Sequence, residues 1–118
     1  MNKNNTLPLV SVIIPFYNQG QYICDALQSV LQSTYKNIEI IIVNDGSTDI
    51  LTNKILKTLK YKQIIIQQKN LGLATARNNG IKSSHGKYFL PLDADDSIDA
   101  TYIEKAISIL ESNSKIGF

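Results

Sequence analysis

Residues 9–14 read LVSVII and are followed by Pro15, and this short apolar run decides how the rest of the chain is interpreted. Further runs of this kind follow at 38–43, 64–66 and 88–92. Each run ends in turn-forming residues and precedes a segment with helical spacing, which is typical of repeated strand–helix units. Richness in Ile and Val without polar alternation indicates strands covered on both faces. The chain therefore predicts a parallel sheet with the element order βαβαβαβα.

Apolar residues at helical spacing mark most of the segments that follow these runs. The residues form three stripes: Ile23, Leu27, Val30 and Leu31; Leu51, Ile55 and Leu59; and Ile103, Ala106, Ile107 and Leu110. The remaining segment, 73–83, is rich in small residues and contains Gly80, so it permits a close backbone approach. We expect an α/β fold, a Rossmann-like open and mainly parallel sheet with helices on both faces.

Length and charge exclude several classes of protein. The chain has 118 residues, of which 43% are hydrophobic, so it fits one domain with a core and is neither disordered nor fibrous. A net charge of +2 predicts no nucleic-acid partner. The single cysteine, Cys24, and the single histidine, His85, argue against an internal disulfide or a Cys/His zinc site within the chain.

The N-terminal residues 1–8 are expected to form a polar tail ahead of the folded part, 9–118. The sequence contains no signal-peptide pattern and no apolar run near the roughly 20 residues that a membrane span requires. We expect a cytoplasmic protein that is membrane-associated only as part of a longer parent. The sequence does not indicate an oligomeric state.

Three carboxylates, Asp93, Asp95 and Asp96, follow the last apolar run. Like charges this close repel one another unless they are solvated, protonated or bound to a cation. In an extended strand end Asp93 and Asp95 point to the same side, which suits Mg²⁺ or Mn²⁺ bound together with a substrate phosphate. The alternative is an ordinary strand-to-helix turn rich in capping residues, and the D-x-D pattern alone leaves both open.

An EF-hand calcium loop is a further alternative, because oxygen-bearing side chains occupy the ligand positions of such a loop over 93–104. However, Ile98 stands where the loop requires glycine. The run 88–92 also looks like a strand, whereas an EF-hand has a helix there. We therefore do not expect an EF-hand.

Other candidates follow the remaining runs, because ligands of open α/β sheets gather outside the carboxyl ends of the strands. Asp45 can accept hydrogen bonds from a ligand, or form an Asx turn that caps the next helix. Tyr17 can stack on a base, or be a half-buried loop aromatic. Arg77, the only arginine, can clamp a phosphate, or lie on the surface.

Familiar nucleotide-binding motifs are missing. No G-x-G-x-x-G follows the first run, which argues against a dinucleotide-binding domain. The glycines at 80 and 86 have the wrong spacing for a P-loop. A nucleotidyltransferase is disfavoured, because the first run is not followed by a glycine-rich loop that contains arginine.

Four motifs occur in order at the ends of the predicted strands: VSVIIPFYN at 10–18, IVNDGSTD at 42–49, NLGLATARNNG at 70–80 and LDADD at 92–96. Together they resemble family 2 glycosyltransferases of the GT-A fold. The resemblance covers nearly the whole chain from Leu9 onward. It corresponds to the N-terminal half of that family's catalytic domain, which binds the nucleotide-sugar.

The resemblance implies roles for individual residues. Asp45 would hydrogen-bond the base, commonly uracil, and Arg77 would lie toward the diphosphate. Asp93 and Asp95 would hold the metal, Mn²⁺ or Mg²⁺, with Asp96 as a supporting group or helix cap. The nucleotide-sugar-binding residues implied are Pro15, Phe16, Tyr17, Asn18, Asp45, Gly72, Arg77, Asp93, Ala94 and Asp95.

The function implied by the resemblance is metal-dependent, inverting transfer of a sugar from a nucleotide diphospho-sugar. A UDP-sugar is the favoured donor, and the acceptor would be a glycan or lipid-linked hydroxyl, as in polysaccharide biosynthesis. In the family the catalytic base comes from the later half of the domain, so we assign none in this chain and expect it beyond Phe118. We therefore expect 9–118 to be a C-terminally truncated part that binds donor and metal. The alternative is a non-catalytic nucleotide-binding or interaction module.

Overall fold

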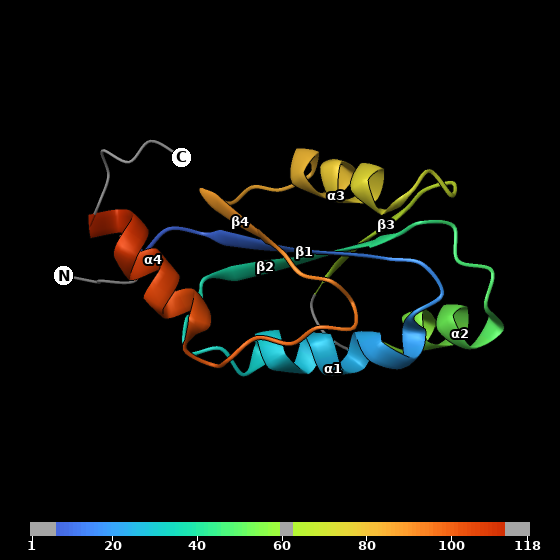
Figure 1. Cartoon of the computed structure of the whole chain (residues 1–118), viewed down its shortest axis with the longest axis horizontal. Coiled ribbons are helices and arrows are strands. Elements are labelled where there is room, and N and C mark those ends of the chain that lie inside the picture. Colours follow the sequence, from blue (N-terminus) through green and yellow to red (C-terminus); the bar gives the residue numbers. More distant parts are fainter. Residues whose placement is uncertain (1–6, 60–62, 113–118) are drawn as a thin grey trace.

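Strands and helices alternate through the computed structural model, which describes residues 7–59 and 63–112 (Figure 1). In chain order the elements are β1 (Val10–Phe16), α1 (Gly20–Leu31), β2 (Ile38–Asn44), α2 (Ile50–Thr58), β3 (Ile64–Gln67), α3 (Leu73–Lys82), β4 (Tyr88–Pro91) and α4 (Tyr102–Ser112). The predicted order of strands and helices is confirmed.

The strands form one parallel sheet in the order β3-β2-β1-β4. β1 pairs with β2 from Val10↔Ile38 to Phe16↔Asn44, and its other side pairs with β4. Parallel neighbours require crossover connections, which the helices between them supply. Because the strands are parallel, the loops that follow them all leave from one edge of the sheet, which we call the carboxyl edge.

Side chains of β1 alternate between two hydrophobic layers. Val12 and Ile14 belong to the larger layer, which buried residues of α1, α2 and α4 complete. Ile13 belongs to the smaller layer, together with Val43 of β2 and Ala76 of α3. Figure 1 shows the corresponding arrangement, with α3 on one side of the sheet and α1 and α2 on the other. Helices therefore cover both faces at the centre of the sheet, as expected from the sequence.

Two of the predicted helix stripes are wrong in part. Leu31 and Leu51 are 40% and 53% exposed, and α2 buries Thr52 and Leu56 instead of Leu51. For Leu51 the cause is a close contact between α1 and α2: the Gly20 amide donates to Thr52 Oγ1 at 3.0 Å, and a Cβ on Gly20 would lie 2.5 Å from Thr52 Cα. This contact turns Thr52 inward, so the adjacent Leu51 faces solvent.

The polar tail expected over residues 1–8 lies outside the described residues except for Leu7 and Pro8. Asn37 Nδ2 donates to the Leu7 carbonyl at 2.8 Å, and the Tyr35 hydroxyl donates to the Pro8 carbonyl. The chain just before β1 is therefore attached to the segment before β2. Within the described residues, no helix is both long and apolar enough to cross a membrane.

Gly80 lets α3 lie close against the sheet. A Cβ at this position would stand 2.6 Å from Ile13 Cγ2 and 3.1 Å from Val43 Cγ2, both buried. The small residues of the segment 73–83 therefore make room for β1 and β2.

A hydrogen-bonded cluster joins the opposite, amino edge of the sheet to the loop before β4. Glu39 of β2 accepts from Ser11 Oγ at 2.5 Å, from the His85 amide at 2.6 Å and from His85 Nδ1 at 3.0 Å. Ser11 Oγ in turn accepts from the Gly86 amide at 2.9 Å. Burial acts to raise the pKa of Glu39, but the bonds from Ser11 and His85 together outweigh it and hold that pKa below its ordinary value.

We predict that Gly80→Ala destabilises the fold by about 1–3 kcal/mol, because the new methyl group overpacks the contact between α3 and the sheet. Alanine is otherwise the better helix former by about 1 kcal/mol, so a loss of stability isolates the packing term. Urea denaturation measures it, with Asn78→Ala on the exposed side of α3 as control. Equal or greater stability of Gly80→Ala would contradict the close packing.

We predict that the stability contributed by Glu39 depends on pH. Its pKa is lowered in the folded chain, so the stabilisation is present above the ordinary glutamate value of 4.5 and is lost as the pH falls through the folded pKa. Urea denaturation of wild type and Glu39→Gln should give a stability difference at neutral pH that shrinks in acid. A difference that is constant with pH would contradict the assignment.

Candidate functional site

The carboxyl edge carries the acidic residues singled out in the sequence. Asp45 follows β2, and Asp93, Asp95 and Asp96 follow β4. β1 lies between these two strands, so the two sets are separated across the sheet by two strand spacings, about 10 Å. The loop after β1 therefore lies between them.

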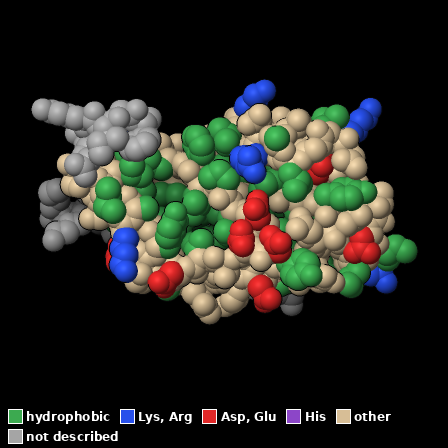
Figure 2. Space-filling model, in the orientation of Figure 1, with side chains coloured by type: hydrophobic (Ala, Val, Ile, Leu, Met, Phe, Trp, Pro, Cys, Tyr) green, Lys and Arg blue, Asp and Glu red, His purple; other side chains and the backbone are tan. Residues whose placement is uncertain are grey.

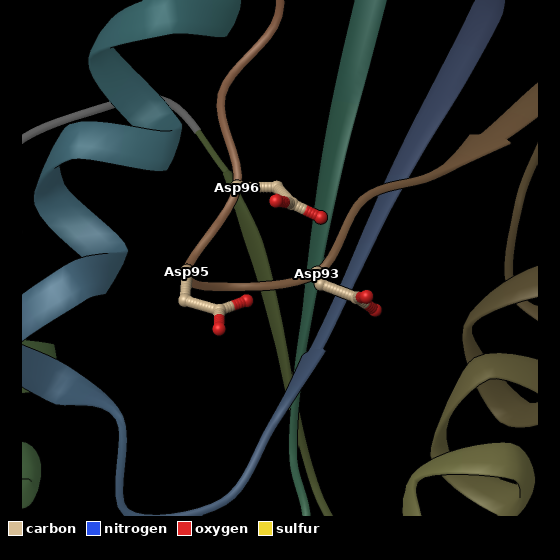
Figure 3. Close-up of side chains that lie close together, drawn as sticks. All are labelled: Asp93, Asp95 and Asp96. Atoms are coloured by element: carbon tan, nitrogen blue, oxygen red, sulfur yellow. The ribbon is translucent and has the colours of Figure 1, made fainter.

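The three aspartates after β4 form an exposed acidic group. One carboxylate oxygen from each lies within 4.8 Å of those of the other two. Figure 3 shows the three side chains on one short turn of the loop after β4, and Figure 2 shows acidic side chains gathered near the centre of one face of the molecule. Oxygen donors this close are what a hard divalent cation such as Mg²⁺ or Mn²⁺ takes as ligands.

The acidic group is formed by a turn and not, as expected, by a strand end. β4 ends at Pro91, and the Asp96 amide donates to the Asp93 carbonyl at 2.9 Å. Ala94 is buried in the larger hydrophobic layer, whereas Asp93 and Asp95 on either side of it are exposed. The turn also adds Asp96 to the group. In an extended strand, Asp96 would point to the side opposite Asp93 and Asp95. Because β4 precedes it, an EF-hand is excluded, in agreement with the sequence-based expectation.

Asp45 is in a different environment, with only 2% of its surface exposed. Its Oδ1 accepts from the Leu71 amide at 2.8 Å and from Gln68 Nε2 at 2.7 Å, and its Oδ2 accepts from the Gly72 amide at 3.1 Å. The carboxylate thereby holds the loop between β3 and α3. Asp45 is therefore a buried, hydrogen-bonded carboxylate, in contrast to the exposed acidic group.

Two residues that sequence reasoning missed complete this network. Gln68 binds Asp45 through Nε2, and its Oε1 accepts from Asn79 Nδ2 of α3 at 2.6 Å. Gln68 directly follows β3, and ligands of open α/β sheets gather outside the carboxyl ends of the strands, so its position in the sequence was a usable signal. Asn79 carries no such signal, because its contact depends on how α3 lies over the sheet.

Asn18 joins the loops after β1 and β2. Its Oδ1 accepts from the Thr48 and Asp49 amides, both at 2.9 Å, and its own amide donates to Ser47 Oγ at 2.9 Å. Its φ is +53°, in the left-handed region that asparagine tolerates better than most residues. Hydrogen bonds from Thr52 hold the pKa of Asp49 below its ordinary value and make Asp49 the N-cap of α2. Polar atoms of Asn18 and Asp49 are thus engaged within the protein.

The predicted residues at the end of β1 divide between core and edge. Pro15 and Phe16 belong to β1 itself, and the Phe16 side chain is fully buried in the larger hydrophobic layer. Tyr17 is half-buried directly after the strand. Of these three, Tyr17 is the aromatic side chain at the carboxyl edge.

Gly72 and Arg77 belong to the start and middle of α3. Gly72 is the N-cap of α3 and has a φ of +99°. No atom lies within 4 Å of the position that a Cβ would occupy. The Gly72 amide donates to Asp45 Oδ2. Arg77 Nε is buried and has no hydrogen-bond partner among the described residues. No ion pair in the described part of the chain joins Arg77 to the aspartates. The structure therefore brings Gly72 to Asp45, whereas Arg77 Nε has no partner in the part of the chain that the structure describes.

Comparison with solved structures identifies the fold. The chain superposes on TarS of S. aureus, solved in complex with UDP-GlcNAc, with a TM-score of 0.80 and 28% identity, covering 90% of this chain and 32% of that one. It superposes on the mannosyltransferase PcManGT of Pyrobaculum calidifontis, solved with GDP-Man and Mn²⁺, with a TM-score of 0.66 and 25% identity, covering 76% and 28%. The expected Rossmann-like fold of the GT-A type is confirmed.

Sequence comparison identifies the family. An uncharacterized glycosyltransferase of Haemophilus influenzae is 44% identical over 112 residues, which are 92% of this chain and 35% of that protein. The chain thus spans about a third of the length of this relative. The profile of glycosyl transferase family 2 matches residues 11–118. With this match over nearly the whole chain, and with the fold and ordered motifs described above, the protein belongs to glycosyl transferase family 2.

Proposed function

We propose that this chain is the donor-binding part of a metal-dependent, inverting glycosyltransferase that uses a nucleotide diphospho-sugar. The observation that carries the proposal is the pair of carboxylate sites at the carboxyl edge, the buried Asp45 behind β2 and the exposed acidic group behind β4. A buried acceptor suits recognition of a neutral N–H group, and an exposed acidic group suits a cation that neutralises a diphosphate. One nucleotide diphosphate presents both kinds of group.

We favour a UDP-sugar as the donor. TarS, at 28% identity, was solved with UDP-GlcNAc, whereas PcManGT, at 25% identity, was solved with GDP-Man. Tyr17 offers a flat aromatic surface for stacking between the two carboxylate sites. Pro15, Phe16 and Ala94 are buried, so we assign them the role of holding Tyr17, Asp93 and Asp95 in place.

We propose that Asp93 and Asp95 hold Mn²⁺ or Mg²⁺, with Asp96 within reach of the same ion. The donor set fits, since it consists of carboxylate oxygens that lie within 4.8 Å of one another. A bound divalent cation would neutralise negative charge that develops on the departing diphosphate. Arg77 is the further cation that we assign to the diphosphate, because its Nε lacks a partner among the described residues.

In the proposed reaction an acceptor hydroxyl oxygen forms a bond to the anomeric carbon of the sugar. The bond from that carbon to the diphosphate oxygen breaks, and its electron pair leaves with the nucleoside diphosphate. The hydroxyl proton passes to a carboxylate base, which we assign to sequence outside this chain, together with the site for a glycan or lipid-linked acceptor. This chain contributes binding and orientation of the donor and dispersal of the leaving group's charge.

Calorimetric titration of the chain with UDP, with and without Mn²⁺, tests the proposal. We predict binding that Mn²⁺ strengthens, and at least a tenfold loss of that affinity in Asp95→Asn, about 1.4 kcal/mol, because the variant lacks one ligand charge. Circular dichroism should show an unchanged fold, since Asp95 is exposed. GDP in place of UDP reports the choice of base, and CaCl₂ alone tests for a plain ion site.

The matched control is Asp25→Asn, which removes the same charge from an exposed position on α1 that lies outside the acidic group. It should bind UDP and Mn²⁺ as the wild type does. Equal UDP affinity of Asp95→Asn and wild type in Mn²⁺ would rule out the metal assignment. Absence of nucleotide binding by the wild type would favour an interaction module.

Tyr17→Ala should weaken UDP binding by about 1–3 kcal/mol and leave the response to Mn²⁺ intact, because stacking and metal binding use different residues. The same titrations measure both effects. Tyr22→Ala, at a tyrosine of α1 that is 45% exposed, is the control and should behave as wild type. Equal losses in the two variants would contradict a stacking role for Tyr17.

A further inference from the structure

A chain of side-chain hydrogen bonds runs from α3 to the buried carboxylate of the site. Asn79 Nδ2 donates to Gln68 Oε1 at 2.6 Å, and Gln68 Nε2 donates to Asp45 Oδ1 at 2.7 Å. Asn79 and Gln68 are half-buried, and Asp45 is almost completely buried. The low local dielectric strengthens such bonds and makes an unmatched polar group costly.

The direction of these bonds sets the orientation of the Gln68 amide. Because the Asp45 carboxylate only accepts, Gln68 turns its N–H₂ group toward Asp45 and its oxygen toward α3, where Asn79 Nδ2 donates to that oxygen and secures the orientation. If Asn79 presented an oxygen instead, the amide would turn over and place Gln68 Oε1 against the carboxylate of Asp45. Asn79 therefore supports, through Gln68, the second donor at Asp45 Oδ1, beside the Leu71 amide.

The bonds also define which acceptor position of Asp45 stays free. A carboxylate has about four lone-pair positions. Oδ1 uses two of them, for Gln68 and the Leu71 amide, and Oδ2 uses one, for the Gly72 amide. Among the described residues, this leaves one acceptor position without a donor, on Oδ2.

We propose that Gln68 and Asn79 are positioning residues for the donor base, which orient Asp45 and confine its free acceptor position to Oδ2. This inference rests on the proposed binding of a nucleotide at Asp45. Neither residue contacts the base in this scheme. The backbone donors Leu71 and Gly72 hold the carboxylate without Gln68, so the loop and the fold persist when Gln68 or Asn79 is changed.

Gln68→Glu provides a readout that a purely structural role would not produce. When protonated, the new carboxyl group donates to Asp45 as the Gln68 amide does; when ionised, it places a like charge 2.7 Å from Oδ1. In calorimetric titrations with UDP and Mn²⁺, we compare the UDP affinity of Gln68→Glu with that of wild type at the same pH. The ratio of the two affinities should be near one in mildly acidic buffer and should fall by about tenfold or more in mildly alkaline buffer. Gln68→Ala should be weaker at both pH values by a constant factor.

Asn79→Asp tests the other end of the chain. Its side chain offers only oxygen to Gln68, so the amide turns over and UDP affinity should fall by about tenfold. The double variant Asn79→Asp/Gln68→Ala should bind no more weakly than Gln68→Ala alone, because Asn79 acts only through Gln68. Lys82→Gln, which makes the same change in net charge at an exposed position of α3, should bind as wild type.

The outcomes separate this inference from the proposed function. Wild type that binds no UDP overturns both. Wild type that binds UDP, with a pH-independent affinity ratio in Gln68→Glu or additive losses in the double variant, overturns the positioning role and leaves donor binding standing. Thermal unfolding of each variant must match that of wild type within a few degrees; a loss of affinity accompanied by a loss of the fold assigns these residues to stability and overturns the inference.

Discussion

The complete burial of β1 between β2 and β4 is the constraint on which the rest of the structure depends. Every residue of this strand is buried, and its backbone pairs with β2 along its whole length and with β4 from Val10 to Ile13. A strand in this position requires apolar side chains on both faces, and parallel neighbours require helical crossovers to bring the chain back. One consequence is that all loops after the strands leave from the same edge, so residues far apart in sequence share one site.

The two carboxylate sites at that edge differ in a way that suits different chemistry. Asp45 is almost completely buried and accepts three hydrogen bonds, so its position is determined by the protein before any ligand arrives. The acidic group behind β4 is exposed, and its oxygens lie close together. Repulsion between carboxylates this close is reduced by water or by a cation. In the function that we propose, the buried acceptor and the acidic group, on either side of β1, bind two different parts of one donor.

Contacts outside the exposed acidic group maintain the geometry of this edge. Gly80 brings α3 against Ile13, so Asn79 on the same helix comes within reach of Gln68. At the amino edge, Glu39 ties β1 and β2 to the loop before β4. Asn18 ties the loop after β1 to the loop after β2. Glu39 and Asn18 each form hydrogen bonds with residues on other elements, so these loops are held in place by tertiary contacts.

The sequence by itself determined the element order, the parallel sheet and the acidic candidates. Uninterrupted apolar runs and the turn-forming residues that follow them are local features of the sequence, so they can be recognised without the tertiary structure. Its patterns also carried the family resemblance, since the four motifs keep their order along the chain. Tertiary structure alone decided which face α2 buries, since contact between Gly20 and Thr52 outweighs the apolar stripe that includes Leu51. It also decided that a turn adds Asp96 to Asp93 and Asp95, and that Asn79 reaches Asp45 through Gln68. Such contacts depend on the distance and rotation between packed elements, which hydrophobic periodicity does not specify.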